Sequence, residues 1–170
     1  MTHDDQNDLF AYAMSEFIKQ NFSKSQELLD KLLERNPRQK VALITRGVAH
    51  LKSGHLDEAI ADFDRSIQVD PDYARAFHMR GLAKEGKREH EAALADFDKA
   101  VELSPEYGAA YYSRSALYAK MGKEDLAAED IEMVAHLTNA NIEAFANENN
   151  LWRSLHLGIE QELLESELDR

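Results

Sequence analysis

The three prolines of this 170-residue chain lie 34 residues apart, at Pro37, Pro71 and Pro105. Proline lacks a backbone N–H and clashes with the preceding helical turn, so each of these residues is expected to end a helix. One further step of 34 residues reaches Asn139, which we expect to stop a fourth helix in the same way. A fixed period of this length indicates tandem structural repeats.

Residue size follows the same period when the chain is aligned in blocks that begin at residues 6, 40, 74 and 108. Small residues occupy positions 8 and 20 of every block, and large apolar residues occupy positions 4 and 24. In the third block these residues are Phe77, Gly81, Ala93 and Phe97. The spacing predicts two amphipathic helices per block, A and B, whose backbones approach closely at the small residues.

A turn between the two helices is expected near position 15. Gly54 and Gly122 occupy that position in the second and fourth blocks, and glycine readily takes the left-handed backbone that ends a helix. The third block has its glycine two residues earlier, at Gly86. We therefore expect a looser turn there.

The aligned columns resemble the tetratricopeptide repeat pattern, which also has alanine at position 27 and proline at position 32, here Ala100 and Pro105. The resemblance implies an all-α fold, a right-handed α-solenoid of four helical hairpins with the A helices lining a concave face. It also implies protein binding rather than catalysis. The expected segments are a disordered leader (1–5), four repeats (6–39, 40–73, 74–107 and 108–141), and a capping helix with an acidic tail (142–170).

The segment after the fourth repeat no longer fits the pattern in phase. Residues 142–157 nevertheless have apolar residues on one side of a predicted helix. A solenoid needs an end element that covers the last repeat and has a polar outer face, and we expect Phe145 and Trp152 to anchor such a cap. Residues 159–170 either extend the cap or dock on another surface.

The composition excludes several classes of function. The chain has no cysteine, and it carries no zinc-type histidine spacing, phosphate-binding glycine loop or serine-nucleophile motif. We therefore expect no enzyme activity, no metal and no cofactor. The net charge of −12 argues against nucleic acid or an anionic membrane as the partner. Without a spanning segment or a targeting signal, the expected location is the cytoplasm.

Arginine at position 7 and aspartate at position 23 occur together in blocks two to four, and both are missing from block one, which has Tyr12 and Leu28. This joint occurrence predicts a structural ion pair within each hairpin. Pairing between consecutive repeats through the same two columns would leave Arg46 facing Leu28, so it is disfavoured. The predicted pairs are Arg46–Asp62, Arg80–Asp96 and Arg114–Asp130.

The family resemblance places positions 2, 5, 9 and 12 of each A helix on the concave face. Among them, we assign to a partner-binding groove Phe10, Met14, Phe17, Val41, Ile44, Val48, Leu51, Arg75, His78, Leu82 and Tyr112. Part of this set is expected to pack between neighbouring A helices, and the remainder to form an apolar patch at the N-terminal end. A carboxylate clamp, known from one subgroup of the family, is not expected, because Thr45 and Met79 replace its asparagine and arginine.

The function expected from these observations is that of an adaptor or scaffold whose groove holds an apolar or amphipathic segment of a protein or peptide partner. Two alternatives remain open at this point. The N-terminal apolar face could instead form a homo-oligomer, or the chain could act as a chaperone for a secreted or membrane-inserted client.

Overall fold

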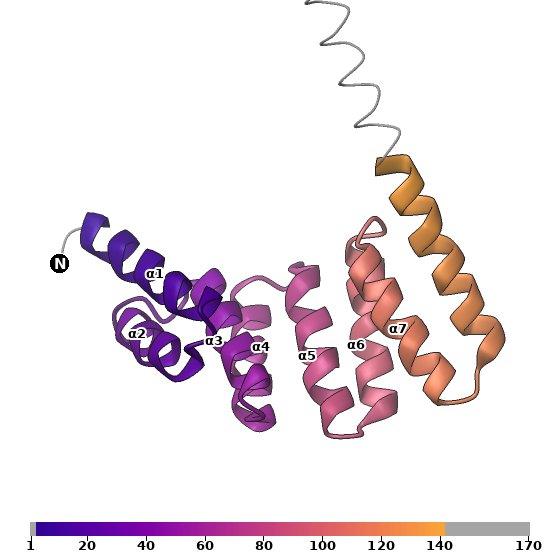
Figure 1. The fold of residues 1–170 in the computed structure, drawn as a ribbon, viewed down its shortest axis with the longest axis horizontal. Coiled ribbons are helices and arrows are strands. Elements are labelled where there is room, and N and C mark those ends of the chain that lie inside the picture. Colours follow the sequence, from indigo (N-terminus) through magenta and orange to yellow (C-terminus); the bar gives the residue numbers. More distant parts are fainter. Residues whose placement is uncertain (1–2, 142–170) are drawn as a thin grey trace, which may run out of the picture.

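The computed structural model describes residues 3–141, and every regular element within them is an α-helix. The helices form hairpins that stand side by side in the order of the sequence (Figure 1). They are α1 (His3–Ile18) and α2 (Phe22–Arg35), α3 (Lys40–Lys52) and α4 (Leu56–Val69), α5 (Ala74–Gly86) and α6 (His90–Leu103), and α7 (Gly108–Lys120) with a last helix at residues 124–141. The fold is therefore the all-α solenoid that the family resemblance implies. In this part of the chain, no helix is both long and apolar enough to cross a membrane.

The prolines set the ends of α2, α4 and α6. The residue before each proline, Asn36, Asp70 or Ser104, has a non-helical backbone with φ of −129°, −143° and −144° and ψ of 78°, 95° and 86°. The proline ring excludes the helical conformation for the residue that precedes it. All three helices consequently stop at the same position of the repeat.

The expected stop at Asn139 is wrong. Residues 138–141 are helical, and the hydroxyl of Thr138 donates to the carbonyl of Val134 one turn earlier, at 2.8 Å. Asparagine is only a weak helix former, and it neither lacks an N–H nor clashes with the preceding turn, so it does not end the helix. The last helix runs at least four residues past the point where the other B helices end, and it reaches beyond the neighbouring hairpins in Figure 1. The predicted cap, with Phe145 and Trp152, lies outside the described residues.

The turns inside the four hairpins share one geometry. The residue at position 15 has a left-handed backbone in every repeat, with φ of 63° at Gln20, 80° at Gly54, 64° at Arg88 and 72° at Gly122. The following N–H donates to the carbonyl five residues earlier at 2.9–3.0 Å in all four turns. The looser third turn expected from Gly86 is therefore wrong, because Arg88 takes the same left-handed conformation that Gly54 and Gly122 take in the second and fourth turns.

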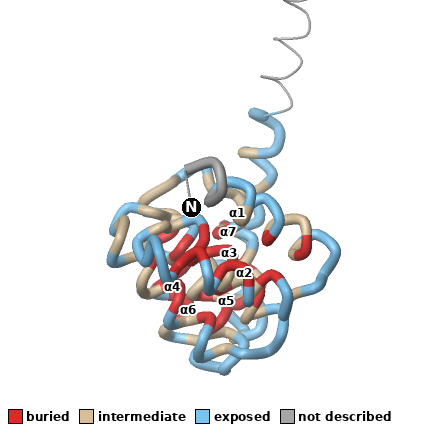
Figure 2. The backbone as a smooth tube through the Cα atoms, turned by 90° about the vertical axis from the view of Figure 1, so that its left-hand side faces the viewer, coloured by how far each residue is buried: buried red, intermediate tan, exposed pale blue. Residues whose placement is uncertain are grey.

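Close approach of a glycine to a phenylalanine ring locks the two central hairpins. A Cβ atom built on Gly81 would lie 2.5 Å from Cε1 of Phe97, and one on Gly47 would lie 2.5 Å from the same atom of Phe63. Both rings are fully buried. The first hairpin uses the smaller Leu29 at that position, opposite an alanine. Figure 2 shows the buried residues along the middle of the stack.

The core is divided into three clusters, each formed by consecutive helices. The first joins α1, α2 and α3 around Leu29 and Leu43, the second joins α3, α4 and α5 around Phe63, and the third joins α6 and α7 around Phe97. Each hairpin is therefore stabilised mainly by its immediate neighbours, as in other solenoids.

The contact between Gly81 and Phe97 gives a test of this packing. Gly81→Ala should lower the free energy of unfolding by about 1–3 kcal/mol, because the new methyl group overpacks a buried ring. Gly108→Ala is the matched control, since its Cβ would meet nothing closer than Leu137 at 3.8 Å. Denaturant unfolding of both variants measures the difference, and equal stability of the two would contradict the packing argument.

The strained turn at Arg88 gives a second test. Arg88→Gly should raise the free energy of unfolding by about 0.5–1 kcal/mol, because relief of the left-handed strain exceeds the added entropy of the unfolded chain. Gly54→Arg in the equivalent turn should have the opposite effect, since it introduces strain without a steric contact. Thermal melts of the two variants should shift in opposite directions; shifts of the same sign would contradict a shared turn geometry.

Candidate partner-binding trough

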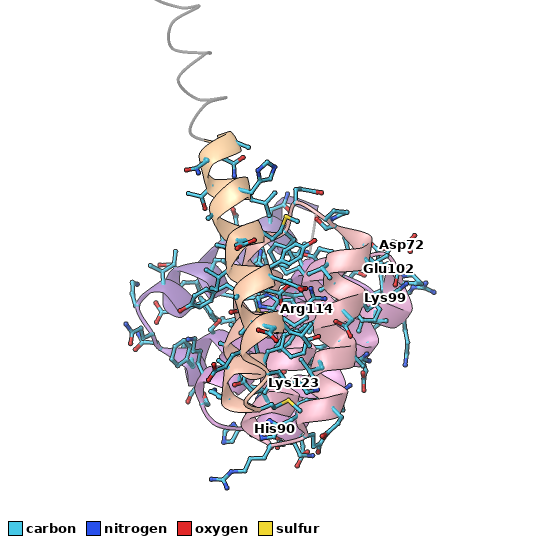
Figure 3. The ribbon with its side chains drawn as sticks, turned by 90° about the vertical axis from the view of Figure 1, so that its right-hand side faces the viewer. Asp72, His90, Lys99, Glu102, Arg114 and Lys123 are labelled. Carbon is cyan, nitrogen blue, oxygen red and sulfur yellow. The ribbon has the colours of Figure 1, made fainter. Side chains whose placement is uncertain are left out.

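Three arginines of the A helices form the pairs expected within each hairpin. The Nε atoms of Arg46, Arg80 and Arg114 donate to the predicted aspartates at 2.8–2.9 Å, and a second nitrogen of each donates to the other carboxylate oxygen. The aspartates are almost completely buried, and the arginine side chains are less than one fifth exposed. Figure 3 shows Arg114 beside the last helix, where it meets Asp130. These arginines have a structural role and are not available to a ligand.

The same arginines also connect consecutive hairpins, which the sequence analysis missed. The remaining guanidinium nitrogen of each donates to an aspartate sixteen residues earlier, at 2.6–2.7 Å, in the pairs Arg46–Asp30, Arg80–Asp64 and Arg114–Asp98. The three acceptors all stand at position 25. Their recurrence every 34 residues was a signal that could have identified them. We call this series of bridged arginines the arginine ladder.

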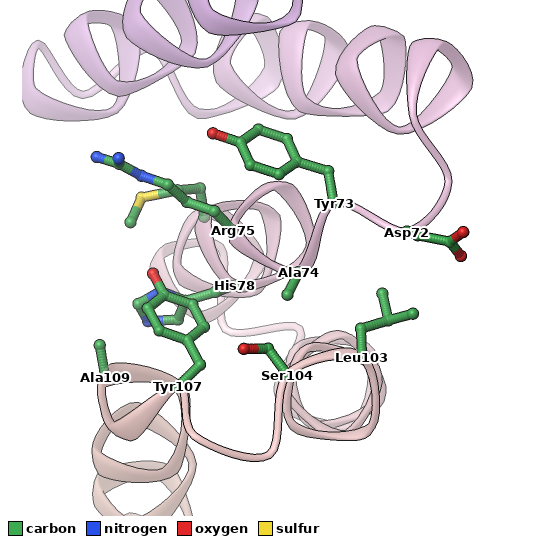
Figure 4. A pocket seen from close by; sticks show the side chains of 10 residues that line it. Asp72, Tyr73, Ala74, Arg75, His78, Leu103, Ser104, Tyr107 and Ala109 are labelled. Carbon is green, nitrogen blue, oxygen red and sulfur yellow. The ribbon is translucent and has the colours of Figure 1, made fainter.

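Three adjoining pockets lie along the A helices. The first, of about 200 Å³, is formed by α1, α3 and the start of α5; its lining residues are Met14, Phe17, Val41, Ile44, Thr45, Val48, Tyr73, Arg75 and Met79. The second, of about 590 Å³, lies between the start of α5 and the connection from α6 to α7 (Figure 4). The third, of about 390 Å³, lies between α7 and the last helix and includes Tyr112. Because neighbouring pockets share lining residues, they form one continuous trough.

Most of the predicted groove residues line this trough. Ile44 and His78 are buried at its floor, whereas Val41 and Tyr112 are 46% and 61% exposed. The residues that do not line it are Phe10, Leu51 and Leu82. Each of these three packs against a core cluster, because a neighbouring helix covers its position. The structure therefore places these three residues beside the core clusters.

Two lining columns were not expected from the sequence. Position 6 lines the trough in repeats two to four through Thr45, Met79 and Ser113, and position 34 lines it through Tyr73, Tyr107 and Asn141. The tyrosines precede α5 and α7 at the same place in the repeat, so their spacing could have identified this column. Thr138 and Asn141 belong to the extension of the last helix, which therefore forms part of the wall of the third pocket.

His78 joins the floor of the trough to two other segments. A hydrogen bond of 2.9 Å links its Nδ1 to the hydroxyl of Tyr107, and one of 2.8 Å links its Nε2 to the hydroxyl of Ser113. The Tyr107 ring lies edge-on to the imidazole, with 5.2 Å between ring centroids (Figure 4). Burial, with a smaller contribution from the charge of Arg75, lowers the pKa of His78 to about 4. The imidazole is therefore neutral at pH 7.

Arg75 is the one cationic residue among the side chains that line the three pockets. It is exposed, and within the described residues it has neither a hydrogen bond nor an ion pair. The acidic lining residues are Asp72 and Glu106. The rest of the lining is mainly apolar or aromatic, so the trough presents apolar pockets around a single free guanidinium. Among residues 3–141, no group of histidine and acidic side chains could hold a metal ion.

Comparison with known families agrees with this architecture. Residues 41–73 and 74–107 each match a family model described as tetratricopeptide repeat. The chain contains tetratricopeptide repeats. The matched segments are the second and third repeats, which hold the glycine–phenylalanine contacts. The Protein SGT1 homolog of Oryza sativa subsp. japonica is 31% identical over 71 residues, which is 42% of this chain and 19% of that protein.

Several solved structures have the same arrangement of helices. MamA 41-end from Desulfovibrio magneticus RS-1 matches with a TM-score of 0.72 and 22% identity, over 81% of this chain and 78% of that chain. TTC0263, a thermophilic TPR protein in Thermus thermophilus, matches with a TM-score of 0.70 and 19% identity, over 79% of this chain and 75% of that chain. The first TPR of Spaghetti (RPAP3), bound to HSP90 peptide SRMEEVD, matches with a TM-score of 0.67 and 17% identity, over 72% of this chain and 97% of that chain. At these identities the likeness shows the fold alone.

The lowered pKa of His78 predicts a pH dependence of stability. The unfolded imidazole has a pKa of about 6.5, so the unfolded chain binds the proton more readily than the folded chain does. The stabilisation is present above pH 6.5 and is lost as the pH falls towards 4.

His78→Gln should therefore reduce the drop in melting temperature between pH 7 and pH 5. His55→Gln, at an exposed histidine outside the trough, is the control and should keep the full drop. An undiminished drop in the His78 variant would show that this imidazole is not the group responsible.

Proposed function

We propose that this protein is a non-enzymatic adaptor or scaffold that binds an apolar or amphipathic segment of a partner protein along the trough. The observation that carries the proposal is the continuity of three pockets along the A helices, each of them mainly apolar. Apolar surface of this extent on a folded chain commonly marks an interaction site.

The side chains of the trough suit such a ligand. Val41 and Tyr112 are among the large apolar residues that stay exposed, and they stand at opposite ends of the trough. Met14 and Met79 line the first pocket, and methionine adapts its shape to different apolar partners. A segment with apolar side chains at several pockets and a hydrogen-bond acceptor opposite Arg75 would use all of these features.

The presence of tetratricopeptide repeats supports a protein or peptide as the partner, and the Spaghetti (RPAP3) repeat was solved with a peptide bound. The identity of the ligand is not transferred from that structure. Thr45 and Met79 line the first pocket of the present chain where a carboxylate clamp would require polar and cationic groups. We therefore propose apolar contacts as the main source of affinity.

Self-assembly is the competing use of an apolar surface. Tyr12 and Ile18 on α1 are 49% and 75% exposed, and neither residue lines the trough. A homo-oligomer formed through α1 would leave the three pockets open. The two functions are therefore separable by mutation.

The test begins with selection of binding peptides from a displayed library of apolar and amphipathic sequences, using the full chain as bait. Val41→Lys combined with Tyr112→Ala should weaken the selected peptide at least about tenfold, which corresponds to about 1.4 kcal/mol. Fluorescence polarisation measures the affinity. The substituted side chains are exposed, so the melting temperature should change little.

Tyr12→Ala is the matched control, since it removes a similarly exposed tyrosine outside the trough. It should leave peptide binding unchanged. Equal affinity of the trough variant and the wild type would reject the trough as the binding site. If Tyr12→Ala alone lowered the mass measured by light scattering, self-assembly through α1 would be the better assignment.

A further inference from the structure

A further pocket, of about 340 Å³, lies outside the trough. It is formed by the connection between α2 and α3 and by the end of α4, and its lining residues are Pro37, Arg38, Arg65, Gln68 and Val69. None of these residues lines the three pockets of the trough. The pocket is therefore a separate surface at the junction of the first two repeats.

The lining of this pocket is basic, although the protein as a whole has a net charge of −12. Two arginines line it, and no acid does. The acids that flank this stretch of α4 already have partners, because Asp64 pairs with Arg80. Asp70 in turn pairs with Lys40. The positive charge of the pocket is therefore available to a ligand.

The polar side chains of the pocket also have unused hydrogen-bond donors. Among residues 3–141, Arg38 and Gln68 are exposed, and neither side chain has a hydrogen bond or an ion pair. One Nη atom of Arg65 donates to the carbonyl of Pro37 at 3.4 Å, and the other lies 3.8 Å from a carboxylate oxygen of Asp62. An arginine side chain has five N–H donors in a fixed fork. The contact with Pro37 therefore holds the guanidinium at the pocket and leaves most of its donors free.

The next junction of the solenoid has a different charge at the same place. One period after the two arginines and the glutamine, the chain has Asp72, Lys99 and Glu102. Lys99 donates to Glu102 at 2.8 Å, and all three residues lie at one edge of the molecule in Figure 3. The junction after that has Glu106, Met133 and His136. Stacking of the repeats therefore does not require a pair of arginines here, and the basic pocket is specific to the first junction.

Two guanidinium groups and one amide at the same pocket suit a small oxyanion. The arginine fork makes paired hydrogen bonds to the oxygens of a carboxylate or a phosphate. A side-chain carboxylate offers a single charge, whereas a phosphate monoester carries about −1.5 to −2 at pH 7 and has three strong acceptor oxygens. Arg38 and Arg65 together match the charge of the phosphate, and the Gln68 amide adds a donor for its third oxygen.

The acidity of the rest of the chain restricts how that phosphate is presented. A nucleic acid or an anionic membrane brings many negative charges over a wide area, and its binding needs clustered lysines and arginines. This chain has 32 acidic residues against 20 lysines and arginines, so such a surface would be repelled outside the pocket. A single phosphate group on a protein side chain needs only the local charge of the pocket.

We propose that this pocket binds a phosphorylated serine or threonine side chain of a partner protein. Arg38 and Arg65 contact the phosphate oxygens from the connection and from α4, and the amide of Gln68 donates a further hydrogen bond. Pro37 and Val69 supply apolar contacts to the carbon atoms of the same side chain. The site shares no residue with the trough and does not depend on the function proposed for it.

A nuclear magnetic resonance titration of the full-length protein with N-acetyl-phosphoserine amide tests the proposal. The backbone amide signals of Arg38 and Gln68 should shift, and N-acetyl-glutamate amide should bind at least about tenfold more weakly, because it brings a smaller charge. Arg38→Ala and Arg65→Ala should each weaken phosphoserine binding at least about tenfold, which corresponds to about 1.4 kcal/mol. Arg38 is exposed, so its replacement should leave the melting temperature unchanged.

Lys99→Ala is the matched control, because Lys99 has the place of Arg65 one repeat later and pairs with Glu102. It should leave the affinity unchanged. Unshifted amide signals at the pocket, equal binding of the glutamate compound, or an equal loss in the Lys99 variant would each overturn the proposal. A single-stranded DNA oligonucleotide that binds more tightly than phosphoserine, and through the same two arginines, would assign the pocket to a nucleic acid instead.

Discussion

The double use of each ladder arginine fixes how consecutive hairpins sit against one another. A buried aspartate must be paired, because an uncompensated charge in this environment is strongly destabilising. Asp62, Asp96 and Asp130 satisfy this requirement through the planar fork of one arginine, which also reaches an aspartate of the preceding repeat. Lysine could not meet two carboxylates with the same fixed geometry. The offset between hairpins is therefore set by directed hydrogen bonds, in addition to apolar packing.

The shape of the trough depends on that offset. Each of its pockets is lined by residues of more than one repeat, so the pocket volumes depend on how far each hairpin is displaced from the next. The hydrogen bonds of His78 to Tyr107 and Ser113 tie α5 to α7 at the floor of the trough. A site that is held in shape before the ligand arrives loses less conformational entropy on binding. The polar hydrogen bonds therefore hold the apolar pockets in their shape.

The sequence predicted the features that depend on single residues with one strong conformational preference. Proline ended three helices where expected, and the paired columns identified the partners within each hairpin. Asn139 failed as a stop because weak helix propensity does not exclude a helical backbone. Arg88 showed the reverse case, in which the repeat geometry imposed a conformation that its own residue type disfavours. The second aspartate of each arginine and the lining columns at positions 6 and 34 depend on how repeats stack, which the pattern within one repeat does not describe.

The division of the core into three clusters also determines which hairpins unfold locally while the rest of the molecule stays folded. Because each cluster joins only consecutive helices, separating the first hairpin from the rest leaves the contacts around Phe97 intact. Opening free energies in such a stack are expected to increase from the ends towards the middle. The first hairpin lacks the ladder arginine, whereas α5 contributes both Arg80 and His78 to its neighbours. Amide protons of α5 should therefore exchange with solvent more slowly than those of α1, so the central pocket persists while the terminal hairpins open and close.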